Sequence, residues 1–75
     1  NPSRDKFNIE FNSDEVQDIR VKITNMVGEE IYTEGLTQFI GQYTKQVDLS
    51  NHAKGVYFLR IISDRGGINK KLTLQ

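Results

Sequence analysis

Apolar and polar side chains alternate along most of the chain with a period of two residues. The pattern is clearest over residues 6–12, where Phe7, Ile9 and Phe11 fall on one face and Asn8 and Glu10 on the other. This alternation is typical of a β-strand with one buried and one solvated face. It predicts strands over residues 6–12, 16–25, 29–34, 42–49, 56–63 and 68–75. In residues 16–25 it places Ile19, Val21 and Ile23 inward and Arg20, Lys22 and Thr24 outward, and in residues 68–75 it places Ile68, Lys70, Leu72 and Leu74 on one face.

Turn-forming residues separate these runs at the spacing of hairpins. The alternation breaks at Asn25-Met26-Val27-Gly28, where Asn favours the start of a turn and Gly supplies a positive φ. The sequence predicts a compact turn over residues 50–55, either irregular or a single helical turn, which Gly55 closes. Residues 64–67, which end in Gly66 and Gly67, form a predicted hairpin loop, and residues 35–41 a loop with a short edge strand.

Two strands have an expected place in the sheet. The most apolar run, residues 56–63, is expected to be a central strand that is buried on much of both faces. Lys45 falls on the apolar side of residues 42–49, which favours an edge position where its long stem can reach water. Six or seven short strands, with no helix long enough for a crossover, predict an all-β, antiparallel sandwich.

Composition supports one small β domain. Val, Ile, Thr, Tyr and Phe number 25 of the 75 residues, whereas Ala and Met each occur once. Leu, Ile, Val and Phe number 22, which is above the ~20% level below which disorder is favoured. The domain is expected to span residues 6–75, with residues 1–5 as the end of a linker. The absence of Cys excludes a disulfide framework and thiolate metal sites.

Charge is balanced over the whole chain and segregated along it. Residues 1–37 hold four basic and eight acidic side chains (net −4), and residues 38–75 hold six basic and two acidic ones (net +4). A net charge of zero provides no cationic field for nucleic acid, and no apolar run is long enough for membrane insertion. Two explanations of the segregation stay open. Either the halves interleave and neutralise each other, or a basic C-terminal hairpin with Arg60, Arg65, Lys70 and Lys71 faces an acidic partner.

Candidate catalytic and metal-binding residues are few. Asp48, Ser50 and His52 have the residue types of a hydrolytic triad, but residues two apart on a strand are separated by roughly 6.6 Å. Asp48 and Ser50 are better explained as turn-forming and capping residues. His52 is the only histidine, and the acidic set Asp14, Glu15 and Asp18 lacks the glycine-containing loop of a calcium site. The tyrosines fall on three separate strands, so the sequence predicts neither an enzyme nor a cofactor or metal site.

Several segments nevertheless match one known pattern in order and spacing. They are Phe7-Asn8-Ile9-Glu10-Phe11, residues 21–32, Gly41-Gln42-Tyr43, Val47-Asp48-Leu49-Ser50, residues 55–61 and the terminal Asn69-Lys70-Lys71-Leu72-Thr73-Leu74-Gln75. Together they resemble the C-terminal sorting domain of the type IX (Por) secretion system, type A. The resemblance covers essentially all 75 residues, although His52 stands where the family pattern suggests an apolar residue.

The resemblance implies a non-catalytic, Ig-like secretion signal on exported proteins of Bacteroidetes-type bacteria. Such a domain directs the cargo N-terminal to it across the outer membrane, from the periplasm to the cell surface or the medium. The implied partners are translocon components, an outer-membrane shuttle protein and a surface sortase. In many members the sortase removes the domain and anchors the cargo to lipopolysaccharide, and the alternative is release of the cargo. The alternative is an Ig- or fibronectin-like accessory module that binds carbohydrate or protein, which predicts an exposed aromatic cluster.

We expect the closing strand, residues 68–75, to be the element that the secretion machinery recognises. Its recognition residues would be Lys70, Lys71, Leu72 and Leu74, and Arg60 or Arg65 would add a further contact. The turns at Asn25, Gly28, Gly55, Gly66 and Gly67 would fix the register that presents it. Docking on a rigid charged face and strand addition at an exposed edge are both open. The competing explanation for Lys70 and Lys71 is protection of an edge strand against aggregation.

Overall fold

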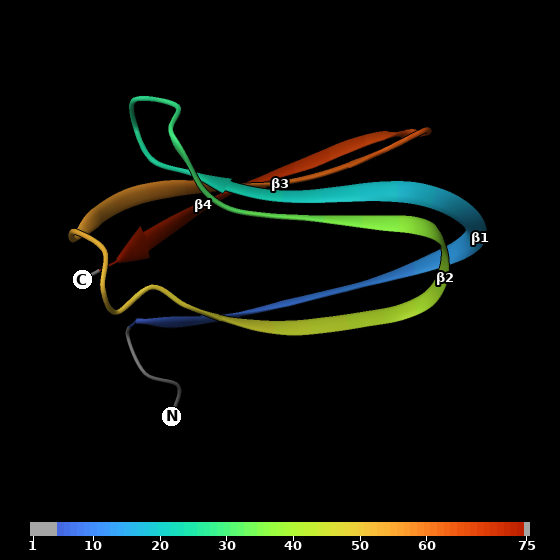
Figure 1. Cartoon of the computed structure of the whole chain (residues 1–75), viewed down its shortest axis with the longest axis horizontal. Coiled ribbons are helices and arrows are strands. Elements are labelled where there is room, and N and C mark those ends of the chain that lie inside the picture. The colour runs from blue at the N-terminus through green and yellow to red at the C-terminus, as the bar shows by residue number, and fades with distance from the viewer. Residues whose placement is uncertain (1–4, 75) are drawn as a thin grey trace.

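The computed structural model describes residues 5–74, which form one antiparallel sheet of four strands (Figure 1). The strands are β1 (Lys6–Thr24), β2 (Glu30–Asp48), β3 (Gly55–Ser63) and β4 (Gly66–Leu74), in the order β2-β1-β3-β4. Of the predicted linker over residues 1–5, only Asp5 is among the described residues, and Gln75 also lies outside them. The Asp5 carbonyl oxygen accepts a hydrogen bond from the Leu49 N–H (2.7 Å), so Asp5 is already tied to the domain.

The first two strands bend sharply and fold back together (Figure 1). Each has 19 residues and would span about 60 Å if straight, whereas the longest dimension of the molecule is 36 Å. The bend coincides with shifts in the β1–β2 register between Ser13 and Ile19. On the β2 side, Gln38 and Gly41 have positive φ angles of 48° and 105°. Such irregularities bend a strand pair without ending its pairing.

Side chains hold the bend where the regular ladder is interrupted. The buried Ser13 hydroxyl donates to the Glu15 carbonyl oxygen (2.6 Å) and accepts from the Gln17 side-chain amide (2.8 Å). The Asp18 carboxylate accepts a hydrogen bond from the Gln38 N–H (2.9 Å), which joins the bend of β1 to that of β2. These bonds replace backbone partners that a straight strand would have.

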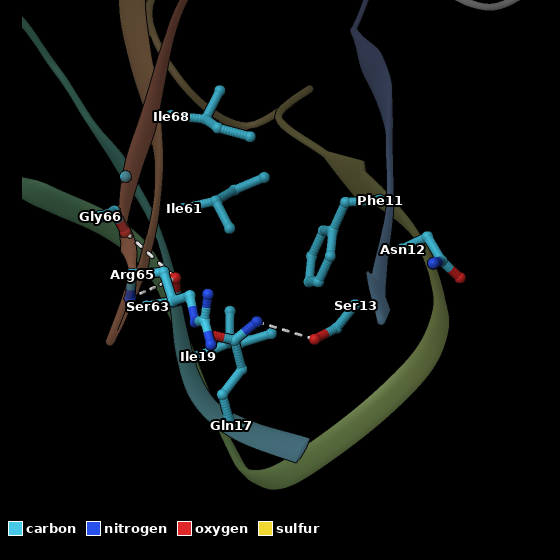
Figure 2. Close-up of a pocket in the computed structure, with 11 residues that line it drawn as sticks. Phe11, Asn12, Ser13, Gln17, Ile19, Ile61, Ser63, Arg65, Gly66 and Ile68 are labelled. Atoms are coloured by element: carbon cyan, nitrogen blue, oxygen red, sulfur yellow. Dashed lines mark hydrogen bonds between the residues drawn. The ribbon is translucent and has the colours of Figure 1, made fainter. Parts of the chain in front are cut away.

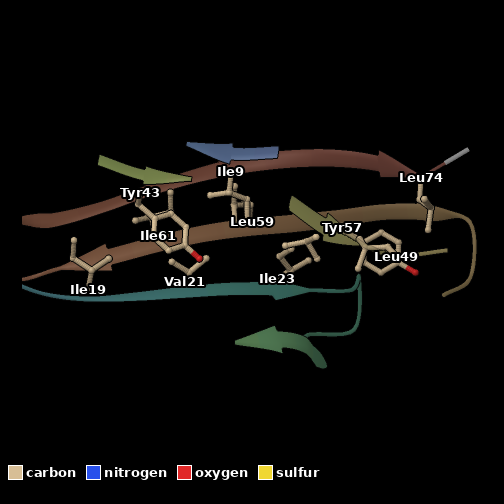
Figure 3. Packing of buried hydrophobic residues seen from close by; sticks show 11 residues of the cluster. Ile9, Ile19, Val21, Ile23, Tyr43, Leu49, Tyr57, Leu59, Ile61 and Leu74 are labelled. Atoms are coloured by element: carbon tan, nitrogen blue, oxygen red, sulfur yellow. The ribbon is translucent and has the colours of Figure 1, made fainter. Parts of the chain in front are cut away.

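Folding back produces two layers from one sheet. The small layer pairs residues 6–13 of β1 with residues 41–48 of β2, and the large layer contains the other halves of β1 and β2 together with β3 and β4. The core lies between the layers, and its side chains converge from both halves of β1, from the end of β2 and from β3 and β4 (Figure 3). Its buried members are Ile9, Ile19, Val21, Ile23, Tyr43, Val47, Leu49, Tyr57, Leu59, Ile61 and Leu74.

The prediction of an all-β, antiparallel fold was correct, but residues 5–74 form four strands of one sheet rather than the six or seven short strands of an Ig-like sandwich. Residues 6–12 and 16–25 are parts of the continuous β1, and residues 29–34, 35–41 and 42–49 largely coincide with β2. Turn-prone residues such as Ser13 and Gly41 mark bends inside these strands rather than their ends. The structure therefore shows a single folded sheet of four strands where the sequence predicted a sandwich of separate strands.

The predicted positions of two strands were correct in part. β3 is an interior strand, paired with β1 on one side and β4 on the other, as expected for residues 56–63. Only one of its faces is buried, however, because Phe58 and Arg60 are exposed on the other face. β2 is an edge strand and Lys45 is exposed on it, as its place on an apolar face predicted.

Candidate recognition surface

The closing hairpin of β3 and β4 is built around a two-residue turn at Asp64 and Arg65. The Ser63 hydroxyl donates to the Gly66 carbonyl oxygen (3.2 Å) and accepts from the Arg65 N–H (3.3 Å). Gly66 has φ +126°, a conformation that L side chains rarely adopt. At Gly67 a Cβ would lie 3.2 Å from the Ile61 carbonyl oxygen, so close packing disfavours a larger residue there.

The other turn residues lie at the ends of strands. The Asn25 side-chain oxygen accepts hydrogen bonds from the N–H groups of Val27 (3.1 Å) and Glu29 (2.9 Å), and Gly28 follows with φ +88°. Gly55, with φ +142°, opens β3 after the turn. That turn contains no helical turn. The two hairpin turns and the connection from β2 to β3 thus depend on side-chain capping or on a glycine with positive φ.

The register of β4 against β3 places the two predicted recognition lysines on opposite faces. Lys70 lies opposite the buried Leu59 and shares the inner face with Ile68, Leu72 and Leu74. Lys71 lies opposite the exposed Phe58 and belongs to the outer face. Since neighbouring residues of a strand point to opposite faces, one flat partner surface cannot contact both side chains in the same way.

The outer face of the large layer is basic. Lys71 shares this face with Arg60, and the register adds Arg20 and Lys22 from the neighbouring β1. Lys22 lies directly opposite Arg60 and is paired with Glu30 (3.0 Å). The alternation alone placed Arg20 and Lys22 outward, but only the strand order shows that they are neighbours of Arg60.

Arg65 is separated from this basic face. It lies at the tip of the closing hairpin, and its guanidinium is 2.8 Å from the Glu15 carboxylate at the bend of β1. A second ion pair joins Lys54 to Asp5 (3.2 Å). Both pairs connect the acidic half of the sequence with the basic half, as the interleaving explanation of the charge segregation requires. Exposed pairs of this kind each contribute about 0–1 kcal/mol to stability.

The inner face of β4 is covered only at its end. Leu74 is 1% exposed and Leu72 is half-buried, whereas Ile68 is 58% exposed. The reason is that the small layer has two strands and does not extend over β4. Leu74 therefore anchors the closing strand in the core, while Ile68 and Lys70 remain accessible.

A pocket opens between the layers beside the bend (Figure 2). Phe11 and Ser13 line one side, and Ile19, Ile61 and Ile68 line the other. The Gln17 side-chain oxygen is buried and has no hydrogen-bond partner among residues 5–74, while its amide nitrogen donates to Ser13. The pocket thus combines apolar side chains with a polar end near the bend, where Asn12, Ser63 and Arg65 also line it.

The residues of the candidate triad do not assemble. The Asp48 carboxylate accepts a hydrogen bond from the Ser50 N–H (2.9 Å), and this bond lowers the pKa of Asp48. His52 is exposed, and its backbone N–H donates to the Leu49 carbonyl oxygen (3.0 Å). Asp48 and Ser50 therefore form a capped turn, which is the role that the sequence favoured.

The acidic residues near the bend each have a separate role. Asp14 accepts from the Asn12 side chain (2.8 Å), Glu15 pairs with Arg65, and Asp18 binds the Gln38 N–H. Over residues 5–74, no three His, Cys, Asp or Glu side chains gather where they could hold a metal ion. A helix long and apolar enough to cross a membrane is likewise not found in this part of the chain.

The tyrosines form no exposed aromatic platform. Tyr43 and Tyr57 are buried, and Tyr57 donates to the Ala53 carbonyl oxygen. Tyr43 stacks on Phe11, with ring centroids 4.8 Å apart, inside the fold. The accessory-module alternative therefore lacks the aromatic cluster that it predicts among these residues.

These features define a class of protein: a small all-β domain with exposed charged and apolar surfaces. The family model of the secretion system C-terminal sorting domain matches residues 1–75, and the chain belongs to this family. It is a non-catalytic sorting signal of the Por, or type IX, secretion system, whose cargo is secreted or displayed at the surface. Neither the curated proteins nor the solved structures include a match to the chain.

Proposed function

We propose that the secretion machinery reads this sorting domain through its closing hairpin. β4 is an edge strand of the described sheet, and Lys70 and Lys71 are exposed on its two faces. This placement is the observation that carries the proposal, because it lets partner surfaces reach the strand and one lysine from each face. Arg60 extends the outer side, and Arg65 marks the tip of the hairpin.

Five of the six residues assigned to recognition divide into contacts and supports, and the sixth, Arg65, pairs with Glu15 at the hairpin tip. Lys71 and Arg60 are exposed on one face, where a partner with an acidic surface can dock. Lys70 and the half-buried Leu72 belong to the other face. Leu74 is buried, so its part is to hold β4 in register rather than to touch a partner.

The partners of this proposal are those that a type A signal implies. They are translocon components, an outer-membrane shuttle protein and a surface sortase that removes the domain and anchors the cargo. The type A assignment is supported by the segments Gly55-Val56-Tyr57 and Asn69-Lys70-Lys71-Leu72. The cargo is the region N-terminal to the sorting domain in the same precursor, which lies in the periplasm during transit.

The test is the export of a reporter fused to residues 1–75 in a cell with a working type IX system. Lys70→Ala with Lys71→Ala should reduce the extracellular reporter at least about tenfold, since about 1.4 kcal/mol of lost binding corresponds to a factor of ten. Lys45→Ala on the opposite edge strand is the matched control and should export normally. Normal export by the double variant, with the folded domain confirmed by its unfolding midpoint, would overturn the proposal.

A further inference from the structure

A groove on the inner side of the domain lies beside a strand edge of β1 that pairs with no other strand of residues 5–74. Residues 6–13 of β1 pair with β2 on one side only, because β3 pairs with β1 from Ile19 to Thr24. Along these eight residues, the backbone groups on the other side have no strand partner in the described chain. An edge of this kind is a template for the addition of an extended chain.

The same groove exposes the inner face of β4. It has a volume of about 360 Å³ and lies between Phe7, Ile9 and Phe11 on one side and the β3–β4 hairpin on the other. The hairpin contributes Leu59, Ile61, Ile68, Lys70 and Leu72. Through Phe11, Ile61 and Ile68 it continues into the pocket beside the bend (Figure 2). A strand added along β1 would become the third strand of the small layer and would cover β4.

The chemistry of the groove specifies what such a strand must carry. Ile68 and Leu72 flank Lys70 on one face of β4, and Lys70 makes no ion pair or hydrogen bond within residues 5–74. Covering an unpaired ammonium group with apolar side chains would be costly. An occupant therefore needs a carboxylate opposite Lys70 and apolar side chains two residues away on either side. Glu10 also lines the rim of the groove. It belongs to the outward face of β1, however, because its neighbour Ile9 points into the core, so Glu10 does not supply this carboxylate.

A second copy of this chain fits the groove poorly. If residues 6–13 of a second copy entered the groove, their inward side chains would bring no acid to Lys70. The inward side chains of β4 include Lys70, and those of residues 41–48 include Lys45, so either of these strands would bring a second cation. The remaining edge, the first half of β2, carries Glu34, which already accepts hydrogen bonds from Tyr32 and Tyr43. A strand of this same domain would thus bring a second cation, or no charge, to Lys70.

We propose that this groove accepts an extended segment of a partner protein by strand addition to residues 6–13 of β1. The segment alternates apolar residues with one Asp or Glu that pairs with Lys70. The proposal rests on the proposed function and adds a second contact to it. Lys70 would bind a carboxylate of the inserted segment, whereas Lys71 would contact the acidic surface that docks on the outer face. Main-chain hydrogen bonds supply affinity in this mode, and the alternate side chains supply specificity.

The direct test uses a nine-residue peptide in which Val alternates with Thr and the central Val is replaced by Glu. Bound to the 75-residue chain, it should slow amide hydrogen exchange and shift NMR signals in residues 6–13 and 68–72. The same peptide with a central Lys should bind at least about tenfold more weakly, which corresponds to about 1.4 kcal/mol. Lys70→Glu should reverse this preference. Equal binding of the two peptides, or shifts confined to the outer face, would overturn the proposal, as would protection of residues 6–13 by self-association alone.

Export separates this inference from the proposed function. Ile68→Lys places a charge in the groove at a residue that is 58% exposed, and Ile40→Lys is the matched control at a residue that is 54% exposed. We expect reporter export to fall at least about tenfold only in the first variant. If export depends on Lys70 and Lys71 but not on Ile68, the groove proposal fails and the hairpin proposal stands. If export depends on Ile68 and Lys70 but not on Lys71, docking on the outer face fails and the groove alone is read.

Discussion

At the scale of single residues, the Glu34 side chain links the two layers of the fold. Its carboxylate accepts hydrogen bonds from the hydroxyls of Tyr32 (2.8 Å) and Tyr43, which lie on either side of the bend in β2. The bond from Tyr43, followed by that from Tyr32, lowers the pKa of Glu34. Burial, followed by the bond to Glu34, raises the pKa of Tyr43. A charged glutamate between neutral phenols is therefore the arrangement that stabilises the fold.

The free energy of unfolding should consequently depend on pH through Glu34. The unfolded chain takes up this proton near the ordinary value of 4.5, before the folded chain does. The stability from Glu34 is therefore present above pH 4.5 and is lost as the pH falls through the lower pKa of the folded state. Urea unfolding from about pH 6 to pH 3 should show a shallower decline for Glu34→Gln than for the parent chain. Glu10→Gln on the outward face should keep the parent slope, and identical slopes in all three would contradict this role.

At the scale of strands, alternation predicted which side chains face the core but not where the strands end. Val21 and Ile23 are buried as expected, because the period of two fixes the face of each residue whatever the strand length. Ser13 and Gly41 have the local chemistry of a turn, and sequence alone cannot tell a turn from a bend that keeps its pairing. Whether a strand bends or ends depends on packing against the opposite layer, which comes from distant parts of the chain.

The geometry of the candidate recognition surface was predictable to the same extent. Lys70, Lys71 and Arg60 stay predicted recognition residues, and the alternation correctly placed Lys70 with Leu72 on one face. It could not show that Arg20 and Lys22 lie beside Arg60, since that depends on β1 pairing with β3. Nor could it show that Ile68 is left uncovered, because the width of the small layer follows from the bend and not from any local pattern.

The closing hairpin offers a prediction at this scale. Gly66→Ala places a side chain at φ +126°, so the hairpin must change conformation or carry strain of about 1–3 kcal/mol. The free energy of unfolding should fall by that amount in chemical denaturation. Gly35→Ala is the control, because its φ is not positive and the added Cβ would lie 3.8 Å from the nearest heavy atom, at Arg20. Equal losses in the two variants would show that the φ of Gly66 does not matter.

At the scale of the whole molecule, positive charge gathers on one face of the fold, in addition to its concentration in the second half of the sequence. Two ion pairs join the acidic and basic halves, yet the outer face of the large layer still gathers Arg20, Lys22, Arg60 and Lys71 with Glu30 as the paired acid. Like charges directly opposite on neighbouring strands are destabilising, as for Lys22 and Arg60. Each cation has one partner in the fold, since Lys22 pairs with Glu30 (3.0 Å) and Arg60 donates to the Asn69 side chain (3.2 Å). The face nevertheless keeps an excess of positive charge, which suits an acidic partner.

Arg60→Gln should therefore separate stability from export. Removing the charge relieves the repulsion with Lys22 but also removes the exposed hydrogen bond from Arg60 to Asn69 (3.2 Å), so the free energy of unfolding should stay within about 1 kcal/mol of the parent value. Export of a fused reporter should fall, because the outer face loses a cation next to Lys71, and adding salt should weaken the parent chain's interaction more than the variant's. Lys45→Gln removes one charge from the far edge and should leave export unchanged. A variant that is less stable and still exported at the parent level would mean that Arg60 supports the sheet and is not read by the machinery.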